Sequence, residues 1–299
     1  MTESDQRRPP QRRLTRRQAV RAAGVAGAAA VVLPAWLGDL LSAPVAEAAT
    51  GCAVLTPELT EGPYWVNTML RRSDVRANTA SAKTAPGVVQ PGVPLRLTIN
   101  VLNAGGDCQP LNDVAVDIWH ANAHGLYSDE TSQQAGGGTS GGDTSGQNYL
   151  RGYQITGQDA GAHAAAAAGR VSFRTIWPGW YTGRAIHIHV RVRKLSTSGA
   201  TIAGYTTQIF FSDADNDRVL TGATPYRSRS PERDPTTDEN DTVLQSADDA
   251  TNIVSVTGNL HTGFAATFNI AVDESQADAT GTLSAPSTGA PPAGGPSRP

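Results

Sequence analysis

The sequence predicts a mainly β fold, a sandwich or barrel core with long loops, from its composition and the period of its apolar residues. The chain holds 31 glycines and 19 prolines among 299 residues, about a sixth of the total against an average of roughly 12%. Charged residues make up 17%, below the average of about 25%. These values argue against a long-helix or coiled-coil protein and favour short strands joined by turns.

The alternation of apolar and polar residues predicts the individual strands. Along 93–103, Val93, Leu95, Leu97, Ile99 and Val101 share one face, and polar side chains take the other. A period of two is typical of a half-buried strand. Similar patterns predict further strands at 114–118, 149–156, 171–173, 186–192, 205–211, 251–257 and 264–272. No repeat or linker divides residues 49–275, which we therefore expect to form one domain.

The first 48 residues have the pattern of an export signal. A pair of arginines at 16–17 precedes a weakly apolar run at 22–41, and Ala-Glu-Ala at 46–48 is a small-x-small cleavage site. This order is typical of a twin-arginine signal. A transmembrane anchor is the alternative interpretation, but a proline and an aspartate interrupt the run. We expect residues 1–48 to be removed, which leaves no stable membrane anchor.

The charge is distributed unevenly along the chain. Residues 1–21 hold seven arginines and two acids, a net charge of +5. Without residues 1–48, the chain has 17 basic and 23 acidic residues, a net charge of −6. Nucleic-acid binders keep a basic surface on the folded domain, so we expect no such partner for this acidic, extracellular protein. Residues 276–299, rich in proline, glycine, serine and alanine, are expected to be a disordered tail.

The only two cysteines are Cys52 and Cys108. An even number in an exported protein allows a disulfide bond between them. Two buried free thiols are the alternative. Neither cysteine belongs to a Cys-x-x-Cys motif, so the sequence shows no cysteine-based zinc or redox site.

A His-x-His pair, His187 and His189, is the strongest indication of chemistry. Side chains two residues apart on a strand share a face, so both imidazoles can bind one metal ion. Such a pair alone is more often buried and satisfied, or exposed to solvent. Here it follows a Pro-Gly turn that carries Tyr181, and Arg184 lies three residues before the first histidine. No third histidine or carboxylate has the spacing of a two-His-one-carboxylate site, so a phenolate is the expected further ligand.

Five segments in order resemble the intradiol ring-cleavage dioxygenases, non-haem iron(III) enzymes such as the protocatechuate and catechol dioxygenases. The resemblance is closest to the subgroup with export signals, because the helical N-terminal dimerisation segment of the intracellular catechol dioxygenases is absent. The matching segments are 56–64, 116–127, 149–152, 178–189 and 207–211.

The resemblance implies a prealbumin-like β-sandwich that binds one iron(III) per chain. The four ligands it implies are Tyr127, Tyr181, His187 and His189. It implies that Arg184 stabilises charge on the bound substrate and that Gln208 contacts the ligands without binding the metal. Pro63 and Tyr64 match a segment that lines the mouth of the substrate site.

The implied reaction uses a catechol and O₂, with no organic cofactor. It breaks the bond between the two hydroxylated carbons and gives a cis,cis-muconate, with Tyr181 as one of the bases. Two other classes remain open: a non-catalytic secreted β-sandwich that binds carbohydrate or lignin, and a secreted copper or zinc protein using the histidine pair. The loop at 129–147 and the alanine-rich 162–168 depart from the family pattern, and the particular catechol and the oligomeric state stay open.

Overall fold

The computed structural model describes residues 56–80, 87–105, 107–131, 142–159, 168–226, 236–247 and 250–273. Contacts divide the chain into residues 1–45 and residues 46–299, and all described residues belong to the second unit. The predicted export signal, Cys52, the tail at 276–299 and most of 162–168 lie outside the described residues. Within the described part, no helix has the length and apolar character needed to cross a bilayer.

The described elements are mostly strands, which confirms the predicted fold class. The strands are β1 (Pro94–Asn103), β2 (Gln109–Pro110), β3 (Val114–Trp119), β4 (Arg151–Ile155), β5 (Arg170–Ile176), β6 (His187–Leu195), β7 (Thr201–Phe211), β8 (Ile253–Val254), β9 (Val256–Asn259) and β10 (Gly263–Val272). The helical elements are α1 (Asp213–Gly222), α2 (Thr242–Gln245) and a 3₁₀ turn, η3 (Ala250–Asn252).

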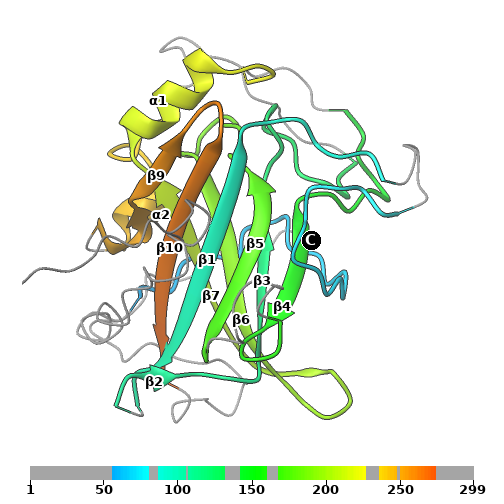
Figure 1. Ribbon diagram of the computed structural model, residues 1–299, viewed down its shortest axis with the longest axis vertical. Coiled ribbons are helices and arrows are strands. Elements are labelled where there is room, and N and C mark those ends of the chain that lie inside the picture. The colour runs from blue at the N-terminus through cyan, green and yellow to red at the C-terminus, as the bar shows by residue number, and fades with distance from the viewer. Residues whose placement is uncertain are drawn as a thin grey trace, which may run out of the picture. The chain divides into compact units, whose positions relative to one another are not determined.

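The strands form two five-stranded sheets that pack as a sandwich (Figure 1). The first sheet has the order β2-β1-β10-β9, with β5 also paired to β1. The second has the order β4-β3-β6-β7-β8. Strand β10 runs parallel to β1, so the last strand lies directly beside the first.

The core lies between the sheets because each strand directs alternate apolar side chains inward. Leu95, Leu97 and Ile99 of β1 are buried there, together with Ile188 and Val190 of β6. A period of two therefore sends the odd-numbered residues of β6 to the outer face of the second sheet.

That outer face is also buried, which alternation alone did not predict. All six residues of β3 are buried. Segment 56–75 runs along this sheet, and backbone hydrogen bonds join Leu59 to Thr206 and Arg72 to Tyr153. Polar side chains on this face must therefore find partners within the protein.

Asp117 and Arg193 form such a pair across β3 and β6. Arg193 Nε and Nη2 donate to the two carboxylate oxygens of Asp117 at 2.6 and 2.9 Å. The guanidinium also lies over the ring of Trp65, 5.7 Å from its centroid. Both charges are thus satisfied in a face that the covering segment shields from water.

Three details differ from the sequence-based expectations. Residues 213–222 form helix α1, which has little amphipathic character and was not predicted. The short helix α2 was also not predicted. The strand expected at 251–257 is divided into η3, β8 and β9.

Cys108 is disulfide-bonded in the structure. Its predicted partner, Cys52, lies outside the described residues. The Cys52–Cys108 pairing therefore stays a prediction.

Candidate metal centre

His187 and His189 lie side by side on the outer face of the second sheet, while Ile188 between them points into the sandwich core. Neighbouring strands extend this row of side chains. His189 is directly opposite Trp119 of β3 on one side and Gln208 of β7 on the other. The sheet therefore holds the two imidazoles, an indole and an amide in a fixed register.

Two phenols join the imidazoles. Tyr127 Oη lies 3.3 Å from His187 Nε2, and Tyr181 Oη lies 3.2 Å from the same nitrogen. His187 Nε2 and His189 Nε2 are 3.1 Å apart. The structure thus brings all four predicted ligands together, two from β6 and two from loops.

These separations fit a shared cation. Two ligands about 2.1 Å from one ion, at about 90–105° to each other, lie about 3.0–3.3 Å apart. In the described part of the chain, no cluster of three or more His, Cys, Asp or Glu side chains could hold a metal. The donor set is two imidazole nitrogens and two phenol oxygens, which suits a hard, highly charged ion such as iron(III).

The protonation states suit the same ion. Burial holds the pKa of His187 and of His189 well below its usual range, so both imidazoles are neutral. Burial raises the pKa of Tyr181 to about 12 and that of Tyr127 well above its usual range. A buried phenolate therefore needs a nearby positive charge, and a bound cation would supply one.

Groups outside the donor set fix the orientation of the two imidazole rings. His187 Nδ1 donates to the carbonyl oxygen of Ala185 at 2.7 Å, which leaves Nε2 facing the other donors. The indole of Trp119 stacks on the ring of His189, with centroids 4.7 Å apart and planes within 6°. Trp65 packs against Trp119 in turn, at 4.8 Å.

The start of the loop after β3 is fixed, which places Tyr127. The carbonyl oxygen of Tyr127 accepts a hydrogen bond from Thr144 Oγ1 at 2.7 Å. Buried Arg151 donates through Nε to Ser128 Oγ at 2.8 Å and through Nη1 to the carbonyl oxygen of Tyr64 at 2.5 Å. Arg151 thus ties the loop that carries Tyr127 to the segment that covers the sheet.

Of the two residues predicted to line the substrate mouth, Tyr64 contacts Tyr127 and Tyr181, the two tyrosines of the predicted ligand set. Its ring stacks on Tyr127 with centroids 4.4 Å apart, and meets Tyr181 edge to face at 6.3 Å. Pro63 is exposed. The turn at 62–65 therefore packs one aromatic ring against the donors and presents the proline to solvent.

Gly62 gives a prediction about this turn. Its φ is +70°, and a Cβ there would lie 3.2 Å from His189 Cε1. Gly62→Ala is expected to destabilise the fold by about 1–2 kcal/mol, the cost of a left-handed backbone for a residue with a Cβ. It should also weaken metal retention, because the new methyl group presses on the His189 ring.

Gly199→Ala is the matched control, since Gly199 has φ +81° and nothing within 4 Å of a built Cβ. Thermal unfolding and metal content of the two variants separate the effects. Equal metal retention by both would contradict the contact with His189.

Arg184 and Gln208 are also brought to the site. Arg184 Nη2 donates to Gln208 Oε1 at 2.5 Å, and Gln208 Nε2 donates to the carbonyl oxygen of Thr60 at 2.8 Å. The charge of Arg184 acts on both phenols, since it lowers the pKa of Tyr127 and of Tyr181 against the larger effect of burial. The guanidinium thus favours negative charge at the donors.

Sequence reasoning missed Asp241. This fully buried carboxylate accepts a hydrogen bond from Arg184 Nε at 2.9 Å. It lies 57 positions from Arg184 in the sequence. The only local signal was an aspartate just before a short apolar stretch, a pattern that predicts a helix N-cap.

His120 is buried, and both of its ring nitrogens have hydrogen-bond partners. Its Nε2 lies 2.6 Å from Thr175 Oγ1 and its Nδ1 lies 2.8 Å from the carbonyl oxygen of Ala121. Burial lowers the pKa of His120 to about 4. It therefore stays neutral where an unfolded histidine, with a pKa of about 6.5, binds a proton.

This difference makes stability depend on pH. Because the unfolded state takes up the extra proton, the free energy of unfolding should fall as the pH drops from about 6.5 to about 4. Urea titrations of the metal-free protein at pH 7 and pH 4.5 measure the loss. In His120→Gln the loss should be smaller by about 2–3 kcal/mol. The other histidines are present in both proteins, so their contributions to the pH dependence cancel. An equal loss of unfolding free energy in the wild type and in His120→Gln would contradict the prediction.

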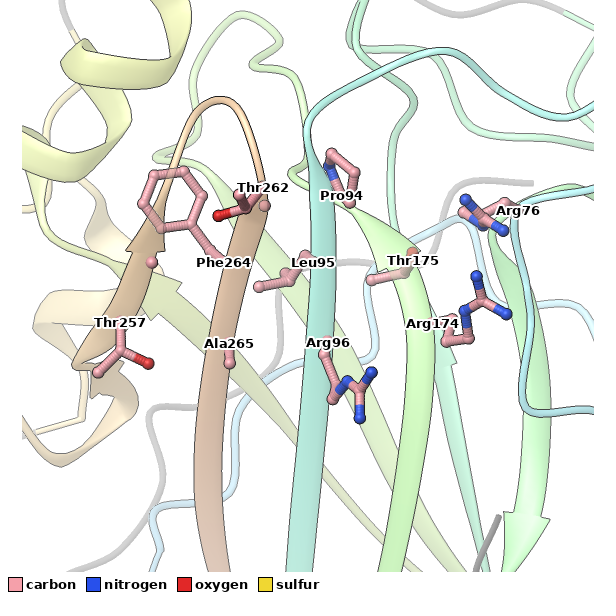
Figure 2. Close-up of a pocket in the computed structure, with 12 residues that line it drawn as sticks. Arg76, Pro94, Leu95, Arg96, Arg174, Thr175, Thr257, Thr262, Phe264 and Ala265 are labelled. Atoms are coloured by element: carbon pink, nitrogen blue, oxygen red, sulfur yellow. The ribbon is translucent and has the colours of Figure 1, made fainter. Parts of the chain in front are cut away.

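A separate groove of about 510 Å³ lies on the first sheet (Figure 2). Arg96 of β1 and Arg174 of β5 are directly opposite each other in the sheet, and both line the groove together with Arg76. None of the predicted site residues lines it. The donor cluster, not this groove, is the candidate functional site.

Comparison with known proteins identifies the class. The sequence profile of the dioxygenase family matches residues 60–230. Because this match covers more than half of the chain, the protein belongs to that family, the intradiol ring-cleavage dioxygenases.

A solved structure with a TM-score above 0.5 shows the same fold. An intradiol ring-cleavage dioxygenase from Tetranychus urticae is 22% identical, with a TM-score of 0.54 over 77% of this chain and 100% of that one. The dioxygenase domain of a carbohydrate-binding fusion from Streptomyces sp. SirexAA-E is 26% identical, with a TM-score of 0.45 over 74% and 99%. A hydroxyquinol 1,2-dioxygenase from Pseudomonas putida DLL-E4 is 16% identical, with a TM-score of 0.44 over 73% and 66%. Among curated proteins the search found no match.

Proposed function

We propose that this protein is an iron(III)-dependent intradiol dioxygenase that cleaves a catechol-type aromatic with O₂. One observation carries the proposal: two phenol oxygens and the Nε2 of His189 lie 3.1–3.3 Å from His187 Nε2. The ligands would be Tyr127, Tyr181, His187 and His189, with one iron per chain. When bound, the iron would supply Lewis acidity toward both catechol oxygens and make the ring reactive toward O₂.

The residues of the chain have separate parts in this reaction. Tyr181 Oη, as a phenolate, is a base that takes one catechol proton. Tyr181 lies in the segment just before β6, and its Oη is 3.2 Å from His187 Nε2. Arg184 stabilises negative charge on the aromatic oxygens, and Gln208 holds the guanidinium at that place.

The overall reaction is balanced. Both atoms of O₂ enter the substrate, the bond between the two hydroxylated carbons breaks, and a cis,cis-muconate-type dicarboxylic acid results. Twin-arginine export, removal of 1–48 and a Cys52–Cys108 disulfide complete the proposal for an extracellular enzyme. Plant-derived or lignin-derived catechols are the substrate class that an exported enzyme would meet.

Colour and oxygen consumption test the proposal together. Protein loaded with iron(III) should be red from tyrosinate-to-iron charge transfer, and oxygen electrodes should record uptake with a panel of substituted catechols. Ultraviolet spectra identify the muconate products. A colourless iron-loaded protein that consumes no oxygen would refute the enzyme, and tight binding of copper or zinc instead would favour a metal-binding protein.

A further inference from the structure

The carboxylate of Asp241 is buried, with no exposed surface. Its Oδ2 accepts hydrogen bonds from Arg184 Nε at 2.9 Å and from the backbone N–H of Ala185 at 2.7 Å. Its Oδ1 accepts from the backbone N–H groups of Val243 and Leu244 at 2.8 and 3.0 Å. One side chain thus joins the approach to β6 to the first turn of α2.

The chemistry of the site requires a carboxylate here. Four N–H groups converge on Asp241, and an ionised carboxylate offers about four acceptor positions and no donor. An asparagine would point an NH₂ group at two of those donors. The buried negative charge is matched by the guanidinium of Arg184, whose side chain is 16% exposed.

The same contacts restrict the guanidinium. Asp241 accepts a hydrogen bond from Nε of Arg184, and Gln208 Oε1 accepts one from Nη2. Gln208 is itself buried and held by the carbonyl oxygen of Thr60. Two of the three guanidinium nitrogens therefore donate to fully buried side chains.

We propose that Asp241 is a positioning residue that sets the guanidinium of Arg184 for charge stabilisation on the bound catechol. Asp241 lies beyond residues 60–230, the part of the chain that matches the family profile. The assignment therefore comes from the contacts of this chain. It rests on the proposed function, because Arg184 has this part only if a catechol binds at the donors.

Two variants separate positioning from helix capping. Asp241→Asn keeps the size of the side chain but loses the charge and one acceptor oxygen. Asp241→Ser retains an N-cap residue for α2 but cannot reach Arg184 with a carboxylate. Both should lower kcat/KM for catechol by about 10–100-fold. The iron content and the visible spectrum without catechol should stay those of the wild type.

A double-mutant cycle tests whether the effect passes through Arg184. We expect Asp241→Ser to cost little more than twofold when it is added to Arg184→Gln, because the group that Asp241 positions is already gone. A purely structural effect would instead multiply with Arg184→Gln and would also lower the iron content. Either of these outcomes overturns the proposal.

A measurement without substrate keeps this test independent of the proposed activity. In ¹H–¹⁵N spectra of the wild type, the Nε–H of Arg184 should be protected from exchange with water, and Asp241→Ser should remove that protection. Wild-type protection without oxygen uptake on any catechol would refute the enzymatic function and leave the contact standing. Unprotected Nε–H in an active wild-type enzyme would overturn the positioning by Asp241.

Discussion

Replacing His189 with alanine is expected to abolish iron retention and, with it, catechol cleavage. His189 supplies one of two neutral imidazoles, and its Nε2 lies 3.1 Å from that of His187. Changes behind a metal ligand already cost about 10–100-fold in metal affinity or activity, so loss of a ligand should cost more than about 100-fold. Iron per chain after dialysis, measured by atomic emission, and oxygen uptake with catechol are the two readouts.

The control for this variant is His261→Ala. His261 is exposed near the β9–β10 turn, away from the donors. It should keep the iron content and activity of the wild type. Unfolding curves of the metal-free proteins show whether His189→Ala still folds. Full iron occupancy and turnover in a folded His189→Ala protein would refute the ligand set.

The second large effect is expected for Tyr127→Phe, which removes one phenol oxygen and keeps the ring. The stacking of Tyr64 on this ring, at 4.4 Å, should survive the change. With one phenolate fewer, the positive charge of the ion is less neutralised. The charge-transfer band should therefore shift or bleach, and turnover should fall by about 100-fold or more.

Tyr149→Phe is the matched control for Tyr127→Phe. Tyr149 is a buried tyrosine whose Oη donates to the carbonyl oxygen of Tyr127 at 3.3 Å, so it touches the same loop without reaching the donors. This variant should lose some stability and keep the visible band. A band unchanged in Tyr127→Phe, or altered equally in both variants, would contradict Tyr127 as a ligand.

Much of the fold follows from local patterns. The alternation in 93–103 and 264–272 predicted β1 and β10 to within one or two residues, because side-chain period is a property of neighbouring residues. The parallel pairing of these two strands was not predictable in this way. Pairing depends on contacts between residues far apart in sequence, which leave no local period.

The same distinction between local patterns and long-range contacts holds for the site. The spacing of His187 and His189 placed both imidazoles on one face, and the resemblance to the intradiol dioxygenases named the two tyrosines. Neither showed that segment 56–75 covers this face, which buries the donors and shifts their pKa values. Asp241 is the clearest example, because its hydrogen bonds with Arg184 and Ala185 form only when the start of α2 packs against the residues just before β6.

The sequence by itself therefore determined most of the strands, the shared face of the histidine pair and the family. These depend on side-chain period and on short ordered motifs, which the chain carries locally. The tertiary structure decided that the other three donors lie within 3.3 Å of His187 Nε2, that Trp119 stacks on His189 and that Asp241 holds Arg184. Each of these needs loops to close over long separations, and the gain in free energy comes from burial and hydrogen bonds that exist only in the folded chain.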